Sequence, residues 1–268
     1  MNIKLVAIDL DDTLLNSGLQ ITDECIKAIE AVREQGVMVT LATGRMYSSA
    51  LPYACQLKVD IPLITYQGAL VKNSQSKEVL YYQPVPGNLA GAIIEFFRNA
   101  QVHYHSYFDD KLYMESLTEE GLLYANLAGV KPYLTEDLRQ DVNNKDAIKI
   151  MGITENEKML MDMEYALKES YGSELNITRS KPYYLEISSR TANKADALEV
   201  VANHYGIKRK EVLAIGDSYN DLAMIEWAGV GVAMGNARDA VKEAADYVTT
   251  TNEEHGVAEA LHKYVLGR

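Results

Sequence analysis

The feature that most constrains the fold is an alternation of short apolar strands and amphipathic helices near the N-terminus. The first predicted strand, 3–9, has no polar side chain from Leu5 to Ile8, which is typical of a parallel strand covered on both faces. Residues 22–35 follow as an amphipathic helix, and a second apolar strand follows at 37–44. This spacing predicts right-handed strand–helix–strand crossovers in a parallel sheet.

The same alternation returns toward the C-terminus, beginning with a helix at 194–205 and a strand at 211–217. Between the two ends, the predicted strands are more polar and carry tyrosines. We therefore predict an α/β fold with a doubly wound, Rossmann-like parallel-sheet core. Residues 1–83 and 189–268 are expected to form this core, and residues 84–188 an inserted α+β cap domain.

Composition limits the classes of function. The chain has 268 residues, and its formal net charge of −12 argues against nucleic-acid and anionic-membrane partners, which attract basic surfaces. No apolar run reaches the length of a signal peptide or a membrane span, so we expect a cytoplasmic protein. Cys25 and Cys55 match no metal or redox spacing and are expected to be buried thiols.

Clustered acids follow the first strand: Asp9, Asp11 and Asp12, with Thr13 next. Side chains at i and i+2 of a strand point to the same side, so Asp9 and Asp11 are expected to face one pocket. Burial and mutual repulsion both disfavour such carboxylates. The cluster therefore predicts a bound cation, a shared proton, or both.

Other polar residues mark the ends or starts of neighbouring elements. Thr43 and Asp217 each close an apolar strand, Lys194 opens a helix, and another helix begins near Asn220. Ligands of open parallel sheets bind beyond the carboxyl ends of the strands, where these residues are predicted to gather. Carboxylates, a hydroxyl, an ammonium and loop amides suit a phosphate held beside a hard cation.

Four stretches resemble, in order, the motifs of the haloacid dehalogenase superfamily: DLDDT at 9–13, ATGR at 42–45, NKAD at 193–196 and GDSYND at 216–221. The large insert after the second motif is similar to that of the Cof-type branch of sugar phosphatases. TYQGAL and the closing GVGVAMGNA are also similar to this branch. The resemblance implies a Mg²⁺-dependent phosphoric monoester hydrolase acting through an aspartyl-phosphate.

The resemblance also implies roles for single residues. Asp9 would be the nucleophile and Asp11 the general acid and base. Mg²⁺ would be bound by the Asp9 side chain, the Asp11 main-chain carbonyl and Asp217. The phosphoryl oxygens would be held by Thr43, the Gly44 amide, Lys194 and Asn220.

Some assignments stay open. Of Asn220 and Asp221, one is expected to reach the site and the other to cap or orient the helix 220–227. Thr13 and Asp221 are further candidates for metal binding or for support of the ligands. Lys194 could alternatively be a solvated lysine at the start of a helix. Asp9 and Asp11 could alternatively be loop acids that form turns.

The sequence departs from the family pattern at two places. Asp12 stands where glycine is usual, and we expect it to adopt a left-handed backbone, which Asp tolerates. The alternative is that its charge tightens metal binding. Gln67 stands where asparagine is common, and we assign it no substrate contact. Arg45 is expected to be a surface or ion-pair residue.

The expected partner is a small phosphorylated metabolite, with sugar phosphates as the leading class and phosphorylated cofactors or flavin precursors behind. The insert should set specificity by covering the pocket. Tyr107, Tyr113, Lys149 and Glu186 are candidates for contact with the substrate, and the sequence does not decide among them. Two other functions remain alternatives: a phosphomutase, and a receiver-like module phosphorylated on Asp. The sequence leaves a monomer and a dimer equally open.

Overall fold

The computed structural model describes residues 2–267, which form two compact units. The core unit comprises Met1–Tyr82 and Asn193–Arg268, and the inserted unit comprises Gln83–Ala192. The predicted division placed these boundaries at 83/84 and 188/189. Within the described residues, no helix is both long and apolar enough to cross a membrane.

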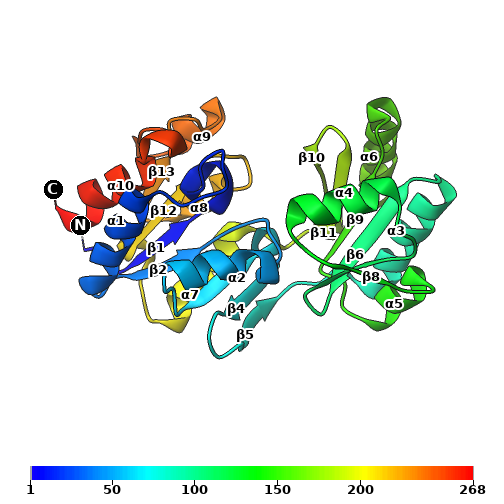
Figure 1. The fold of residues 1–268 in the computed structure, drawn as a ribbon, viewed down its shortest axis with the longest axis horizontal. Coiled ribbons are helices and arrows are strands. Elements are labelled where there is room, and N and C mark those ends of the chain that lie inside the picture. The colour runs from blue at the N-terminus through cyan, green and yellow to red at the C-terminus, as the bar shows by residue number, and fades with distance from the viewer. Residues whose placement is uncertain (1, 268) are drawn as a thin grey trace. The chain divides into compact units, whose positions relative to one another are not determined.

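The core unit contains a five-stranded parallel sheet in the order β14-β13-β12-β1-β2. Figure 1 shows β1 between β12 and β2. This order confirms the expectation that strand 211–217 lies beside strand 3–9, with strand 37–43 on the other side. Ile8 of β1 is in register with Ile215 of β12 and with Leu41 of β2, so the three strands end at one edge. The strands are β1 (Leu5–Ile8), β2 (Met38–Leu41), β12 (Val212–Gly216), β13 (Val230–Ala233) and β14 (Tyr247–Val248).

Helices pack around this sheet, α1 against α10 and α7 against α8. The α-helices are α1 (Asp23–Glu34), α2 (Tyr47–Gln56), α7 (Lys194–His204), α8 (Leu222–Trp227), α9 (Asp239–Ala244) and α10 (Gly256–Leu261). Shorter 3₁₀ or π turns occur at Leu10–Leu14, Tyr66–Gly68, Arg209–Glu211, Asn252–Glu254 and His262–Leu266. Thr22 accepts a hydrogen bond from the Cys25 amide and caps α1, as its position predicts.

The sequence also predicts a strand at 62–66 as the third of the parallel sheet, but this strand belongs mainly to a different sheet. β3 (Pro62–Thr65) pairs antiparallel with β4 (Leu70–Asn73), which pairs with β5 (Val79–Tyr82). A single parallel bridge between Ala42 and Ile64 connects this meander to the end of β2. Of these three strands, the sequence predicts only β3, because β4 and β5 lack a clean alternation of apolar and polar residues.

The two cysteines differ in burial. Cys25 is buried in α1, but Cys55, near the end of α2, is exposed. The prediction that both thiols are buried is therefore wrong for Cys55. It lies on the outward face of its helix, a helical orientation that the spacing of cysteines does not report.

The inserted unit is built on a six-stranded sheet in the order β10-β11-β9-β6-β7-β8. Its strands are β6 (His103–Phe108), β7 (Lys111–Met114), β8 (Pro132–Leu134), β9 (Lys149–Ile153), β10 (Leu175–Lys181) and β11 (Tyr184–Ser189). Its helices are α3 (Gly87–Asn99), α4 (Glu119–Ala128), α5 (Leu138–Asn144) and α6 (Glu157–Tyr171). The sequence pattern does not predict β8 or α5.

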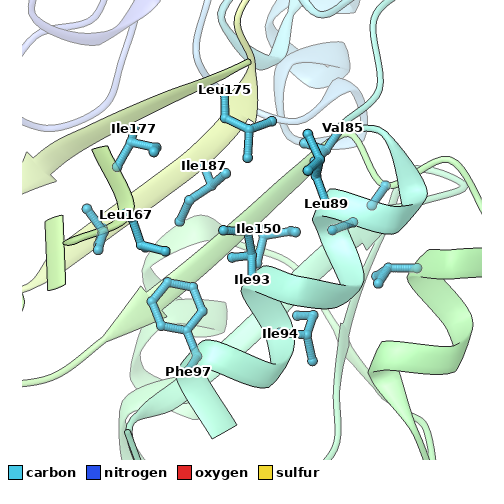
Figure 2. Packing of buried hydrophobic residues seen from close by; sticks show 14 of the residues in the cluster. Val85, Leu89, Ile93, Ile94, Phe97, Ile150, Leu167, Leu175, Ile177 and Ile187 are labelled. Carbon is cyan, nitrogen blue, oxygen red and sulfur yellow. The ribbon is translucent and has the colours of Figure 1, made fainter. Parts of the chain in front are cut away.

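The core of the inserted unit lies on one face of its sheet. Figure 2 shows Ile93 and Phe97 of α3 beside Ile150 of β9 and Ile187 of β11. Alternation along the strands turns the intervening side chains to the other face. On β9, for example, the side chain of Lys149 points to the sheet face opposite that of Ile150, and it is still largely buried.

Candidate active site

The site begins where the parallel strands of the core unit end. Asp9 directly follows β1, and Asp217 directly follows β12. The Asp9 amide donates to the carbonyl oxygen of Ile215 at 3.0 Å, so sheet pairing holds Asp9 beside β12. Both side chains are buried. The topology thus brings two carboxylates, 208 residues apart in the sequence numbering, to one edge of the sheet.

The loop after β1 turns sharply at Asp12, whose φ of 58° lies in the left-handed region. This confirms the expected backbone conformation at the position where the family pattern has glycine. The Asn236 side chain donates to the Asp12 carbonyl at 2.7 Å, and Thr13 Oγ1 donates to Asp217 Oδ1 at 3.0 Å. These bonds attach the loop to the β12 side of the site.

Lys194 lies inside this site, not in solvent. Its side chain has no exposed surface, and its Nζ is 2.6 Å from Asp9 Oδ1 and 2.5 Å from Asp221 Oδ1. A cation in the first turn of α7 opposes the helix dipole, and the two carboxylates offset this cost. The alternative of a solvated lysine is contradicted.

Asp221 is fully buried and holds the loop after β12 as well as the ammonium. Its Oδ2 accepts hydrogen bonds from the amides of Asp217 at 3.1 Å and Ser218 at 3.0 Å. A Cβ atom on Gly216 would come within 2.5 Å of the Asp221 Cβ and Cγ, so only glycine fits there. The spacing in GDSYND was the sequence signal for this arrangement.

Negative charge exceeds positive charge in the cluster, because it contains three carboxylates and one ammonium. Burial raises the pKa of Asp9 well above its usual range. The charge of Asp221 raises this pKa further, and the charge of Lys194 lowers it by less than these two effects raise it. Burial, with a smaller contribution from the charge of Asp221, raises the pKa of Asp217 to about 6. Burial alone would lower the pKa of Lys194, but the charges of Asp221 and Asp9 raise it above its ordinary value.

The donor set fits a hard divalent cation. Asp9, Asp217 and Asp221 each offer a carboxylate oxygen, and the three oxygens lie within 4.8 Å of one another. Oxygen donors of this kind are those that Mg²⁺ prefers. A bound cation would also compensate the excess charge that raises the carboxylate pKa values.

The remaining predicted residues form the rim of this cluster. The Asp11 carboxylate is about half exposed and pairs with Arg45, whose own amide donates to Thr43 Oγ1 at 3.1 Å. The Asn220 side chain donates to Gln67 Oε1 at 2.8 Å. A Cβ on Gly44 would lie 2.3 Å from Gln67 Nε2, so the Gln67 side chain covers the Gly44 backbone.

The structure therefore separates the predicted residues into two groups. Asp9, Thr13, Lys194, Asp217 and Asp221 form one hydrogen-bonded buried cluster, whereas Asp11, Thr43, Gly44 and Asn220 lie in the surrounding loops. Arg45 and Gln67, which connect these loops, have no site role in the sequence prediction, although the ion pair of Arg45 was one of the two expectations for it. Their long side chains bridge segments far apart in sequence, and no local pattern reports such a bridge.

A family model for haloacid dehalogenase-like hydrolases matches residues 6–261. The 5-amino-6-(5-phospho-D-ribitylamino)uracil phosphatase YcsE of Bacillus subtilis is 34% identical, over 99% of this chain and 97% of its own length. The pyridoxal phosphate phosphatase YbhA of Escherichia coli is 28% identical, over 99% of this chain and 100% of its own.

Solved structures agree with these sequence matches. A haloacid dehalogenase-like hydrolase from Bacteroides thetaiotaomicron is 34% identical to this chain. The two structures superpose with a TM-score of 0.90, and the superposition covers 97% of this chain and 99% of the other. The similarity therefore extends over both units, not only over the four motifs.

Proposed function

This chain belongs to the haloacid dehalogenase-like hydrolases and is a phosphatase, and we propose that it hydrolyses small phosphate monoesters through an aspartyl-phosphate on Asp9. The observation that carries this proposal is the buried cluster in which Lys194 pairs with Asp9 at 2.6 Å. It supplies a nucleophilic carboxylate, a fixed cation and further carboxylates at the end of a parallel sheet.

In the first half-reaction, an Asp9 oxygen bonds to phosphorus as the ester P–O bond breaks. The second Asp9 oxygen stays paired with Lys194, so the ammonium orients the nucleophile during attack. Asp11 gives its proton to the leaving oxygen. In the second half-reaction, water bonds to phosphorus, the Asp9–phosphorus bond breaks, and Asp11 takes a proton from that water.

Mg²⁺ would be held by the Asp9 and Asp217 carboxylates, with the Asp11 main-chain carbonyl implied by the family resemblance. Asp221 is better suited to support than to ligation, since its two oxygens already bind Lys194 and the amides of Asp217 and Ser218. When bound, the ion would offset the repulsion between the nucleophilic carboxylate and the phosphoryl oxygens.

Phosphoryl oxygens would be held by Lys194, by the Thr43 hydroxyl and by the Gly44 amide. Asn220 completes this set in our proposal, by exchanging its hydrogen bond with Gln67 for one with the phosphate. Asn220 is exposed, which makes this exchange inexpensive.

We propose that the inserted unit contributes substrate specificity. The sheet face opposite its hydrophobic core carries the ion pair between Lys149 and Glu186, with an N–O distance of 2.7 Å. On the same side, the hydroxyl of Tyr107 donates to that of Tyr124 at 2.7 Å. Such groups can bind hydroxyls of a small leaving group. The two curated relatives are named for different small phosphorylated metabolites, a phosphoribitylamino-uracil and pyridoxal phosphate, which supports this class of substrate. Sugar phosphates stay the leading class in our proposal because of the resemblance to the Cof-type branch alone.

The test is a panel of phosphorylated sugars, cofactors and phosphopeptides, scored by release of inorganic phosphate with Mg²⁺ and with chelator. We expect Mg²⁺-dependent release from small esters, its loss in Asp9→Asn, and its retention in the exposed control Asp23→Asn. Return of the phosphoryl group to the sugar would indicate a mutase instead. A long-lived phosphoprotein, or preference for phosphopeptides, would also contradict the proposal.

A further inference from the structure

The Asp11 carboxylate is held by Arg45 through two hydrogen bonds. Arg45 Nη2 donates to Asp11 Oδ1 at 2.6 Å, and Arg45 Nε donates to Asp11 Oδ2 at 2.9 Å. Because each donor binds a different oxygen, the pair fixes the plane of the carboxylate as well as its position. A single bond from a lysine could not do this.

Arg45 is itself anchored in the core unit. Its guanidinium carbon lies 5.2 Å from the centroid of the Tyr53 ring, and its Nη1 donates to the Tyr53 hydroxyl at 3.4 Å. Its backbone amide donates to Thr43 Oγ1 at 3.1 Å. Only 20% of the Arg45 side chain is exposed, against 49% for Asp11. The arginine is therefore the fixed partner, and the aspartate is the partner that needs fixing.

The pairing leaves Asp11 able to act. An ionised carboxylate has about four lone-pair sites on its two oxygens, and the two bonds to Arg45 occupy only two of them. The remaining sites belong to a side chain that is half exposed. Arg45 can therefore hold the carboxylate in place while one of its oxygens exchanges a proton with another molecule.

We propose that Arg45 is a positioning residue that orients Asp11 for proton transfer. The inference rests on the proposed function and adds a residue to which that function gives no role. Asp11 gives its proton to the leaving oxygen as the ester bond breaks, and it regains one from the attacking water as the Asp9–phosphorus bond breaks. Arg45 stabilises the orientation of the ionised carboxylate that exists between these two transfers.

The dependence of rate on the leaving group tests this role. Alkyl phosphates need a proton on the departing oxygen, whereas p-nitrophenyl phosphate releases a stable anion that needs little help. We expect Arg45→Ala to lower kcat on alkyl phosphates about 10- to 100-fold, with KM changing much less. The loss on p-nitrophenyl phosphate should be at least about tenfold smaller. Arg45→Lys should recover only part of the loss. Arg33→Ala is the matched control, because 26% of the Arg33 side chain is exposed and its ion pair is with Asp60, away from Asp11.

A second comparison separates positioning from a structural role. If Arg45 acts through Asp11, the double variant Asp11→Asn/Arg45→Ala should be no slower on alkyl phosphates than Asp11→Asn alone. Losses that multiply, or equal losses on both ester types, would overturn the proposal while leaving the proposed function intact. Should Arg45→Ala not fold, Tyr53→Phe and Arg45→Lys give the same leaving-group comparison. Wild-type protein without Asp9-dependent phosphatase activity would instead refute the proposed function.

Discussion

Lys194 and Asp9 form an ion pair inside the core unit, with 2.6 Å between Nζ and Oδ1 and no exposed surface on the lysine side chain. The two residues are separated by 185 positions in the chain, so the pair exists only in the folded state. It joins the start of α7 to the end of β1. The same bond that would orient a nucleophile therefore also connects the two sequence segments of the core unit.

Replacing Lys194 by Met should destabilise the protein and abolish activity. The change leaves Asp9 and Asp221 buried beside each other without their cation, and breaking a buried pair in this way costs roughly 3–5 kcal/mol. Urea unfolding followed by circular dichroism measures the effect. Lys58→Met is the matched control, because Lys58 pairs with Glu30 at the surface and 71% of its side chain is exposed. A Lys194 variant as stable as the control would contradict burial of the pair.

Gly216→Ala should impair the site through packing. The added Cβ would lie 2.5 Å from Asp221 Cβ, so either the loop after β12 or the Asp221 side chain must move. We expect a loss of about 1–3 kcal/mol in unfolding free energy and a larger proportional loss of phosphatase activity. Gly18→Ala, in an exposed loop, provides the comparison. Equal behaviour of the two variants would show that the site tolerates the shift.

Mg²⁺ affinity should fall as the pH is lowered. Without metal, burial raises the pKa of Asp217 to about 6 and that of Asp9 well above its usual range. Mg²⁺ binds ionised carboxylates, so it must displace protons at pH values below these pKa values. Calorimetric titration at pH 5 and pH 8 should show much weaker binding at pH 5. Asp217→Asn should bind weakly at both, whereas pH-independent binding to the wild type would place the ion elsewhere.

Acid should destabilise the inserted unit through His103. Burial lowers the pKa of His103 from 6.5 to about 4, despite the opposing charge of Glu120. Between these values the unfolded chain binds a proton that the folded chain does not. Stability therefore falls as pH drops from 6.5 toward 4, by up to roughly 3 kcal/mol from this group.

Thermal unfolding at several pH values tests the role of His103. His103→Gln should reduce the loss of stability between pH 6.5 and 4. Part of the loss will remain, because burial also lowers the pKa of the neighbouring His105. The exposed His204→Gln should leave the decline unchanged. An identical decline in the His103 variant would contradict a buried neutral imidazole.

Local sequence signals were sufficient for the parallel sheet of the core. Strands without a polar face and helices of suitable length between them leave few possible topologies, because crossovers are right-handed and ligands bind at the carboxyl ends of strands. The order of β12, β1 and β2 followed from these rules. The left-handed backbone at Asp12 was also predictable, since it depends on one residue in one loop.

The meander of β3, β4 and β5 was not predictable in the same way. Its strands are four residues long and are stabilised by pairing with one another, so their own sequences carry little periodicity. The exposure of Cys55 was missed for a similar reason. Both depend on the neighbours that the folded chain supplies.

By itself, the sequence determined which chemical groups are present and at which strand ends they lie. Tertiary structure alone decided how the side chains pair: Asp221 rather than Asn220 binds Lys194, and Arg45 holds Asp11. The physical reason is that hydrogen bonds and ion pairs depend on ångström-scale distances and on burial. Residues far apart in sequence acquire both only when the strands and helices have packed.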